Sequence, residues 1–382
     1  MSTIVTFDGA PPPGTINFGV GQPSADLLPV DLLQEASASF FSRAQPIELN
    51  YGVIRGDERF LHSLAGLLTD GYGRNVVPES LFVTAGNSQA LDYVSTVFAM
   101  AGDTVFVEEP SYFLAFQIFR DHGLEVVGIP VDDDGIVIAA LEAALTEHQP
   151  AFIYTIPSFH NPGGHCMSAE RREALVSLSQ RHRFLIVADE VYQLLSYYGA
   201  PPPAFGTMIE SDTVLSLGSF SKILAPGLRL GWIQTSAVLQ QKMLANGFSN
   251  SGGSINHYVS HIVREAIDLG LQAAHLESLR NRLRSRLEAM NEALRASFSG
   301  IAEWSVPGGG YFYWLRVDDG FDTTRLKKTA ATLETGFQPG ALFSSSNGFR
   351  NCLRLSFAHY NEDDIKDGVR RLRRVFDECK RG

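Results

Sequence analysis

The sequence predicts an α/β protein with an open, mostly parallel sheet of seven strands, helices on both faces of that sheet, and a smaller α+β domain. From residue 81 onward, short apolar runs alternate with helical patterns, as in strand–helix–strand units. Past residue 235 this alternation gives way to long amphipathic helical patterns and a few short strands. At 382 residues, the chain also exceeds the length at which one core usually keeps growing, so we expect two domains, or one large domain with an appendage.

The same patterns place the individual elements along the chain. Apolar runs bounded by turn residues predict the seven strands, at residues 81–84, 104–108, 125–130, 151–156, 184–188, 213–217 and 230–235. Helical periodicity predicts helices at residues 30–41, 57–70, 88–100, 112–121, 138–148, 168–182, 237–247, 256–269 and 272–298. The small domain is expected to contain strands at 304–306, 311–317 and 352–357 and a terminal helix at 362–378. We expect the large domain to span 46–279, and the small one to combine 1–45 with 280–382.

Composition and charge exclude several classes of protein. The formal net charge of −11 and the lack of a basic block argue against nucleic acid as a partner. No segment approaches the roughly 20 apolar residues that a membrane span needs, so no membrane partner is expected. The three cysteines, Cys166, Cys352 and Cys379, form no CxxC pair and are too few for a structural zinc cluster. Together with residues 1–13, which lack a secretory or transit pattern, they predict a cytoplasmic protein.

Chemically suggestive residues follow the carboxyl ends of predicted strands, where an open α/β sheet binds its ligands. Gly86, Asn87 and Ser88 join a strand to a helix, and the free N–H groups of a helix start can hold a phosphate. An ordinary helix cap would have the same residues. Asn161 follows another strand, beside permissive glycines, and is placed to donate to a bound heteroatom.

Asp189 and Lys222 end the next two strands. Asp189 follows so apolar a run that it needs a cationic partner or several donors, unless it simply caps a helix. Lys222 stands beside Ser219 and Ser221, with Arg229 seven residues on, in a segment too rich in Ser, Gly and Pro for a solvated charged face. Burial lowers the pKa of a lysine, which suits covalent chemistry with a carbonyl, and the neighbouring donors suit an anion. This combination is what pyridoxal 5′-phosphate (PLP) requires, whereas a surface lysine in a turn is the plainer alternative.

Two further residues leave a functional and a structural interpretation open. Tyr51 lies between glycine-permissive segments and either reaches a ligand or packs. Arg354 interrupts an alternating apolar strand, so it either binds a carboxylate or faces water from an edge strand.

Acidic and histidine pairs elsewhere predict no additional chemistry. Glu108 and Glu109 follow a strand, but consecutive side chains point opposite ways and no partner acid is visible, so we expect a loop acid pair. His160 and His165 lack a third ligand, so we expect no metal site there.

The motifs in this order resemble those of the class I/II aminotransferases, which are PLP enzymes of fold type I, over residues 17–374. Ser219-Phe-Ser-Lys222 with Ala225-Pro-Gly-Leu-Arg-Leu-Gly-Trp232 is similar to the lysine motif of that family. The other matching segments are His160-Asn-Pro-Gly163, Ala188-Asp-Glu-Val-Tyr192, Leu353-Arg-Leu355, Tyr51-Gly-Val-Ile-Arg-Gly56, Thr84-Ala-Gly-Asn-Ser-Gln-Ala90 and Pro307-Gly-Gly-Gly-Tyr311. Gly163 departs from the family, in which Thr or Ser is usual, and His160 and Asn87 occupy variable positions.

The resemblance implies a catalytic group of Lys222, Asp189 and Tyr192. Lys222 would hold PLP as an aldimine and move the proton between the substrate α-carbon and the cofactor. Asp189 would keep the pyridine nitrogen protonated, so that the ring acts as an electron sink. Tyr192 and Asn161 would contact O3′ of the ring, and Tyr112 would stack on it.

The resemblance also implies how phosphate and substrate are held. The phosphate would be bound by Arg229 together with Asn87, Ser88, Ser219 and Ser221. Arg354 would clamp the substrate α-carboxylate, with Asn161 nearby, and Gly21 would lie in the substrate-binding N-terminal segment. Tyr51 would reach the phosphate of a neighbouring subunit, which implies a homodimer with shared active sites.

The implied function is an aminotransferase that moves an α-amino group from an amino acid to a 2-oxo acid. A fold-type-I PLP enzyme that catalyses elimination, substitution or cyclisation is the alternative, because the cofactor's first steps are common to these reactions. A third possibility is the ligand-sensing part of a transcription regulator that resembles this family, which the acidic charge disfavours. Phe18, Tyr112, Phe159 and Tyr311 hint at an aromatic or aliphatic side-chain pocket, and no second arginine stands where a dicarboxylate would need one.

Overall fold

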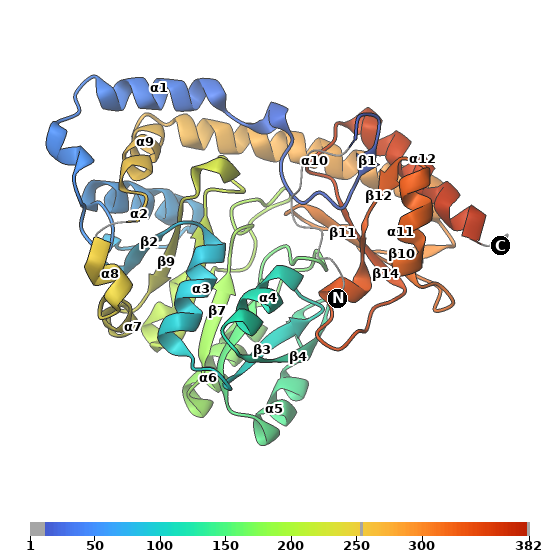
Figure 1. The fold of residues 1–382 in the computed structure, drawn as a ribbon, viewed down its shortest axis with the longest axis horizontal. Helices are drawn as coiled ribbons and strands as arrows, with labels where there is room; N and C mark the ends of the chain where they lie inside the picture. The colour runs from blue at the N-terminus through green and yellow to red at the C-terminus, as the bar shows by residue number, and fades with distance from the viewer. Residues whose placement is uncertain (1–11, 253–254, 380–382) are drawn as a thin grey trace.

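The computed structural model describes residues 12–252 and 255–379, and its ribbon divides into a part built on a large sheet and a part built on a small one (Figure 1). The first eleven residues, which belong to the segment without a targeting pattern, lie outside the described residues. None of the helices in the described ranges is long and apolar enough to cross a membrane.

The large sheet contains all seven predicted strands and one more. Its order in the described chain is β2-β9-β8-β7-β6-β3-β4-β5, and β9 is antiparallel to both of its neighbours, whereas the strands from β8 to β4 run parallel. The bounds are β2 Leu81–Thr84, β3 Thr104–Glu109, β4 Glu125–Asp132, β5 Gly135–Ile136, β6 Pro150–Thr155, β7 Leu185–Asp189, β8 Val214–Ser219 and β9 Gly231–Thr235. Strand β5 escaped prediction because it is a two-residue hairpin partner of β4 without an apolar run.

Helices cover both faces of the large sheet because successive strand residues point to opposite sides. In β3, Val105 and Val107 join the apolar cluster that includes α3 and α4, whereas Phe106 joins the cluster on the other face, which includes α5 and α6. These helices span Asn87–Phe98 (α3), Phe113–Asp121 (α4), Ile138–Glu147 (α5) and Ala169–His182 (α6). The parallel strands are therefore buried on both faces, as their continuous apolar runs indicate.

Helix α2 (Glu58–Tyr72) shows how the sequence sets the limits of an element. The Asp57 carboxylate accepts a hydrogen bond from the Phe60 N–H at 3.0 Å and begins the helix. Gly73, with φ of +63°, ends it in the left-handed region. Between these limits, residues at helical spacing are buried, namely Phe60, Leu61, Leu64, Ala65 and Leu68.

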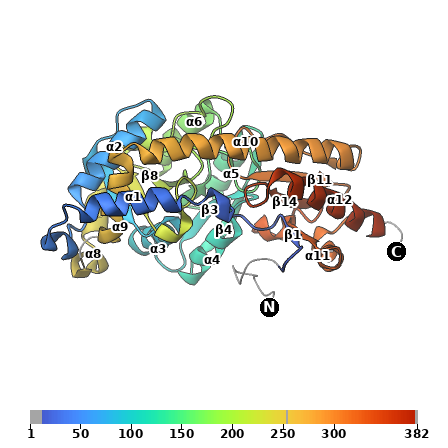
Figure 2. The same ribbon diagram turned by 90° about the horizontal axis from the view of Figure 1, so that it is seen from above.

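The small part contains a four-stranded sheet of order β10-β11-β14-β13 and a parallel pair, β1 with β12. Its strands are β1 Ile16–Asn17, β10 Ala302–Glu303, β11 Phe312–Val317, β12 Thr335–Gly336, β13 Gln338–Pro339 and β14 Cys352–Ser356. Its helices are α11 Thr323–Thr332 and α12 Glu362–Cys379. Helix α10 (Leu271–Phe298) runs along the molecule from the large-sheet part to α12 (Figure 2).

The N-terminal segment contacts both parts. Strand β1 pairs with β12 of the small part, whereas α1 (Val30–Phe41) packs along α9 (His257–Asp268) of the large part (Figure 1). Between β9 and α9 the described chain also forms α7 (Ala237–Leu244) and α8 (Gly247–Gly252). Residues 16–41 therefore connect the small part to the large one.

One expectation for the small part needs correction, and one of its helices was not predicted. The strand expected at 304–306 lies at 302–303, because only Ala302 and Glu303 pair with β11, while the Trp304 indole donates to Asn291 of α10. Helix α11 was not predicted, although Asp322 caps it by accepting from the Thr324 N–H. Its short apolar face was too weak a signal among Thr and Lys residues.

Gly218 offers a test of packing in the large sheet. It lies opposite Trp232 across β8 and β9, and a Cβ at Gly218 would be 2.1 Å from two atoms of the indole ring. We therefore expect Gly218→Ala to lower the free energy of unfolding by about 1–3 kcal/mol or more, because overpacking forces neighbours to shift. Gly227→Ala, where a Cβ would meet nothing within 4 Å, is the matched control for chemical denaturation. A Trp232→Leu background should reduce the cost of Gly218→Ala, and equal costs in both backgrounds would contradict this packing.

Candidate active site

Lys222 lies in the turn that follows β8, with its amine turned toward the N-terminal segment. Its Nζ donates to the Gly21 carbonyl at 3.0 Å and lies 5.3 Å from the centre of the Tyr311 ring. Burial, together with the charge of Arg354, lowers the pKa of this amine to about 8, and Asp189 opposes the shift. Near neutral pH, an appreciable fraction of the amine is therefore uncharged and nucleophilic.

Asp189 ends β7 and is almost fully buried. Its carboxylate accepts hydrogen bonds from Asn87 Nδ2 at 2.7 Å and from the Tyr154 hydroxyl at 2.9 Å. Burial raises the pKa of Asp189, while the hydrogen bonds from Tyr154 and Asn87 act in the opposite direction. The site thus presents an oriented carboxylate that prefers a further proton donor.

The side chain of Asn87 departs from its expected place. We expected it at the phosphate, but it points to Asp189, because a buried carboxylate needs donors. Only the backbone of Asn87, the first residue of α3, lies where we expect the phosphate to bind. Tyr154 was missed as the second donor, since a tyrosine within an apolar strand has no distinctive sequence signal.

Arg354 is buried in β14, between β11 and β13, so it does not face water from an edge strand. Its Nη1 donates to Asn161 Oδ1 and its Nη2 to the Gly19 carbonyl, each at 3.0 Å. Its guanidinium carbon lies 4.1 Å from the centre of the Phe312 ring and 5.1 Å from that of Phe343. Burial lowers the pKa of Arg354 to about 10.

The Arg354 guanidinium still has a hydrogen-bond donor without a partner and a positive charge without a counter-ion among the described residues. Its Nε is buried without a hydrogen-bond partner, and no carboxylate of the described residues lies within ion-pair distance of the guanidinium. A Cβ at Gly21 would be 3.5 Å from Nη2 and 3.3 Å from Phe312, so Gly21 brings the backbone close to this cation. A planar, uncompensated guanidinium between aromatic rings suits a ligand carboxylate.

A second anion-binding corner lies at the start of α3. Arg229 Nη1 is 3.5 Å from Ser221 Oγ, and its Nη2 donates to the Ala85 carbonyl at 3.2 Å. Ser219 Oγ donates to Ser221 Oγ at 3.0 Å, and Ser88 lies in the first turn of α3. Hydroxyls, an arginine and a helix N-terminus converge, which is the combination that holds a phosphate.

The remaining predicted aromatic residues fall into two groups. Tyr192 is buried, with its ring centre 5.4 Å from that of Tyr311 and 6.0 Å from that of Phe312. Tyr112 follows β3, and burial raises its pKa to about 12, with the charge of Asp189 acting in the same direction. Tyr51, in contrast, is 85% exposed and lies outside the group around Lys222.

The expected loop acid pair at Glu108 and Glu109 is wrong. Glu108 is fully buried and accepts from Thr155 Oγ1 at 2.8 Å and from the Ile156 N–H at 2.7 Å. Glu109 accepts from the Ser345 N–H at 2.9 Å and from its hydroxyl at 2.7 Å. Both partners come from distant segments, which adjacent carboxylates in a sequence cannot reveal.

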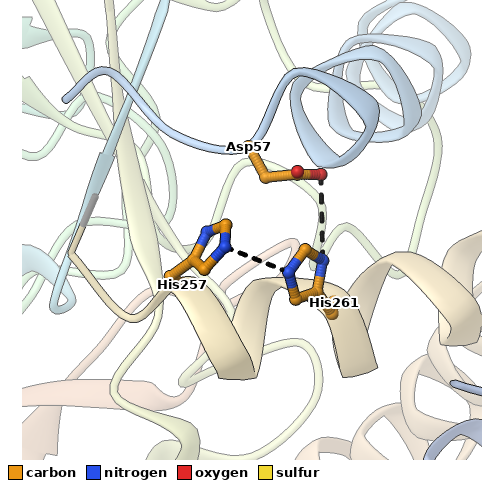
Figure 3. A group of neighbouring side chains, drawn as sticks. All are labelled: Asp57, His257 and His261. Atoms are coloured by element: carbon orange, nitrogen blue, oxygen red, sulfur yellow. Dashed lines mark hydrogen bonds and ion pairs between the residues drawn. The ribbon is translucent and has the colours of Figure 1, made fainter. Parts of the chain in front are cut away.

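A second group of titratable side chains lies at the start of α9 (Figure 3). His257 Nε2 and His261 Nε2 are 3.3 Å apart, and His261 Nδ1 is 3.9 Å from Asp57 (Figure 3). Arg59 and Arg264 each lie 3.8 Å from the same carboxylate. Because two arginines already balance Asp57, the group has little to offer a cation.

Comparisons with known proteins agree with this geometry. The family model for aminotransferase class I and II matches residues 13–372. The chain is 31% identical to aromatic-amino-acid aminotransferase 1 of Thermococcus litoralis, over 95% of this chain and 88% of that protein. It is 32% identical to the 2-aminoadipate transaminase of Thermus thermophilus, over 95% and 90%. The structure of a Pyrococcus horikoshii kynurenine aminotransferase in complex with PMP superimposes with a TM-score of 0.88 at 30% identity, over 95% and 91%.

The residues at this edge of the sheet fit PLP. They supply an amine with a lowered pKa at Lys222, an oriented carboxylate at Asp189 and the anion corner at Arg229. Asn87 Oδ1 and Arg354 Nε are buried polar atoms that still lack partners. A Cβ at Gly231 would lie 2.9 Å from Gly86 Cα, so this pair of glycines keeps the backbones close beneath the anion corner.

Lys222 should react with an amine-acylating reagent in a pH-dependent manner once the cofactor has been removed. Its folded-state pKa of about 8 lies below the ordinary 10.5, so the uncharged amine should accumulate as pH rises through about 8. Peptide mass spectrometry after brief labelling would give the midpoint in native and in denatured protein. The exposed Lys242 serves as the internal control and should react alike in both states. A Lys222 midpoint that does not move on denaturation would contradict the effect of burial.

Proposed function

Because the chain belongs to the class I and II aminotransferases and is a PLP-dependent aminotransferase, we propose that its preferred amino donors carry large apolar or aromatic side chains. The observation that supports this most directly is Arg354, a buried cation without a carboxylate partner in the described chain, held against Phe312 and Phe343. No second arginine of the described residues stacks on these rings or hydrogen-bonds Asn161. The α-carboxylate of a substrate would therefore pair with Arg354, whereas a second, side-chain carboxylate would contact the aromatic rings without a cationic partner.

PLP, when bound, supplies an electron sink that stabilises negative charge at the substrate α-carbon. We assign Lys222 to anchor the cofactor and to carry the proton at that carbon, since its amine is neutral in part near pH 8. Asp189 would hold the ring nitrogen through its carboxylate, whose orientation Asn87 and Tyr154 fix. Tyr192 and Asn161 would donate to the ring oxygen.

The other contacts follow from the two anion-binding groups. The phosphate would be held by Arg229, the N–H groups at the start of α3 with Ser88, and the hydroxyls of Ser219 and Ser221. Tyr112, which lies between β3 and α4, would cover the ring. Arg354 and Asn161 would bind the substrate carboxylate, with the backbone of Gly21 above it.

We further propose a homodimer whose active sites are shared. Many of the exposed large apolar side chains belong to the segment that contains α1 and the following loop, and to α8 and α9, which lie at one end of the molecule (Figure 1). They include Val30, Phe41, Ile47, Leu49, Tyr51, Val53, Phe248 and Tyr258. Such a gathering suits burial against a second copy, and Tyr51 would reach the partner's phosphate.

A division into a large domain of residues 46–279 and a small domain that combines 1–45 with 280–382 remains part of this proposal. The pairing of β1 with β12 supports it, whereas α1 packs along α9. Three free cysteines, none of them paired, are compatible with the cytoplasm as the location.

A panel of amino acids with a 2-oxo acid acceptor tests the substrate proposal. Phenylalanine, tyrosine and leucine should exceed aspartate in kcat/KM by at least about tenfold, because the aspartate carboxylate would be desolvated against rings. Lys222→Ala should abolish transfer, while Lys242→Ala should not. Aspartate as the best donor would refute the proposed side-chain class. Ammonia released without an acceptor would indicate the alternative elimination chemistry.

Mixed dimers test the sharing of active sites. Tyr51→Ala and Lys222→Ala proteins should each be impaired, for the phosphate contact and the amine respectively. After the two proteins are unfolded together and refolded, about a quarter of the sites should be intact, since half of the dimers are mixed and each has one complete site. Recovered transamination, measured against each variant treated alone, is the readout. No recovery in verified mixed dimers would show that each subunit completes its own site.

A further inference from the structure

A buried network of Glu108, His160 and His165 lies directly behind Asn161. Glu108 and His160 are both 0% exposed, and His160 Nε2 is 3.1 Å from a Glu108 carboxylate oxygen. Thr155 and the Ile156 N–H also donate to Glu108. The carboxylate therefore binds the end of β6 and the His160 loop to the end of β3.

The hydrogen bonds fix the state of the His160 ring. Its Nδ1 accepts from the Gly163 N–H at 3.0 Å, so the ring proton resides on Nε2, which faces Glu108. Burial raises the pKa of Glu108, but the adjacent His160 and His165 and the hydrogen bond from the Ile156 N–H together hold the pKa below its ordinary value. Glu108 thus remains a carboxylate that the His160 ring can bind.

Backbone hydrogen bonds close the loop around Asn161. The His160 N–H donates to the His165 carbonyl at 2.9 Å, and the Gly164 N–H donates to the His160 carbonyl at 2.7 Å. The His165 ring stacks on that of His160, with centres 4.5 Å apart and an interplanar angle of 21°. Burial lowers the pKa of His165 to about 3, which keeps this stacked ring neutral.

This stacking accounts for Gly163, where the family usually has Thr or Ser. A Cβ at Gly163 would be 2.7 Å from His165 Nδ1 and 3.0 Å from His160 Nδ1. The His160 ring is fully buried and the half-buried His165 ring is stacked on it, so neither can move aside cheaply. The two histidines and the glycine therefore pack as a unit. Any side chain at residue 163 would occupy the space of the stacked rings.

We propose that Glu108 and His160 are positioning residues that set the orientation of Asn161 and, through it, of Arg354, and that Gly163 is required because the His165 ring, stacked on His160, fills the space of a side chain there. Asn161 is the link, because its Oδ1 accepts from Arg354 Nη1 at 3.0 Å and its backbone lies between His160 and the glycine turn. The inference rests on the proposed roles of Asn161 and Arg354. A cation at the same three side chains is disfavoured, since the Glu108 oxygens and His160 Nδ1 already accept hydrogen bonds.

Four holoenzymes test the proposal, namely wild type, Gly163→Ser, His165→Ala and the double variant. Gly163→Ser should tilt the loop, raise the KM for the amino donor about tenfold to a hundredfold with a smaller change in kcat, and shift the pH midpoint of the bound cofactor's absorbance. His165→Ala should change these values little. The double variant should restore both, because removing the ring frees the space that the serine needs.

Several outcomes would decide the matter. If Gly163→Ser lowers only the melting temperature, with KM and the absorbance midpoint unchanged, the network is structural and the proposal is overturned. The same conclusion follows if the double variant is no better than Gly163→Ser. If Gly163→Ser does not fold, Glu108→Gln replaces it, since it keeps the shape of the side chain but presents an amide to His160, and it should raise KM likewise.

The pH midpoint of the cofactor absorbance is measured without substrate. It therefore tests the positioning network independently of the proposed amino donors. A wild type that fails to transfer amino groups from the donors tested, but whose midpoint responds to Gly163→Ser and recovers in the double variant, would refute the proposed donors and leave the positioning network supported. The reverse pattern would refute the network alone.

Discussion

The site depends on keeping two cations, Lys222 and Arg354, out of water without a carboxylate of the described chain bound to either. Such charges are costly unless dipoles and rings replace water. Backbone carbonyls of the N-terminal segment contact both cations, and Tyr311, Phe312 and Phe343 surround them with aromatic faces. The consequences are a lysine that is partly neutral near pH 8 and an arginine ready for an anion.

Much of the arrangement could be predicted from the sequence because the strands of the large sheet are apolar throughout and end in polar residues. Strand ends in a parallel sheet meet at one edge, so Asp189, Asn161 and Lys222 were placed together by the pattern alone. Arg354 was recognisable as a charge in an apolar strand, although only the structure decides that it faces inward. The resemblance to the aminotransferases then identified the cofactor.

What the sequence could not reveal are contacts between segments that are far apart along the chain. Tyr154 and Asn87 meet at Asp189 from two other elements, and the environment of Glu108 is built from β6 and the His160 loop. A glycine in place of Thr or Ser at residue 163 could be seen in the sequence, but its reason could not. The reason is the pair of stacked rings, which occupies the space of a side chain.

The carbonyl contacts of residues 19 and 21 have a thermodynamic consequence for any ligand. Arg354 already donates to the Gly19 carbonyl and Lys222 to the Gly21 carbonyl. Backbone carbonyls thus accept the hydrogen bonds that a ligand would otherwise accept. A ligand carboxylate therefore replaces an amide carbonyl, and not bulk water, as the hydrogen-bond acceptor. The free energy of binding that it gains is the difference between these two acceptors. Gly19 and Gly21 lie just after β1. The affinity for a carboxylate and the anchoring of this N-terminal segment therefore depend on the same two hydrogen-bond donors, Arg354 and Lys222.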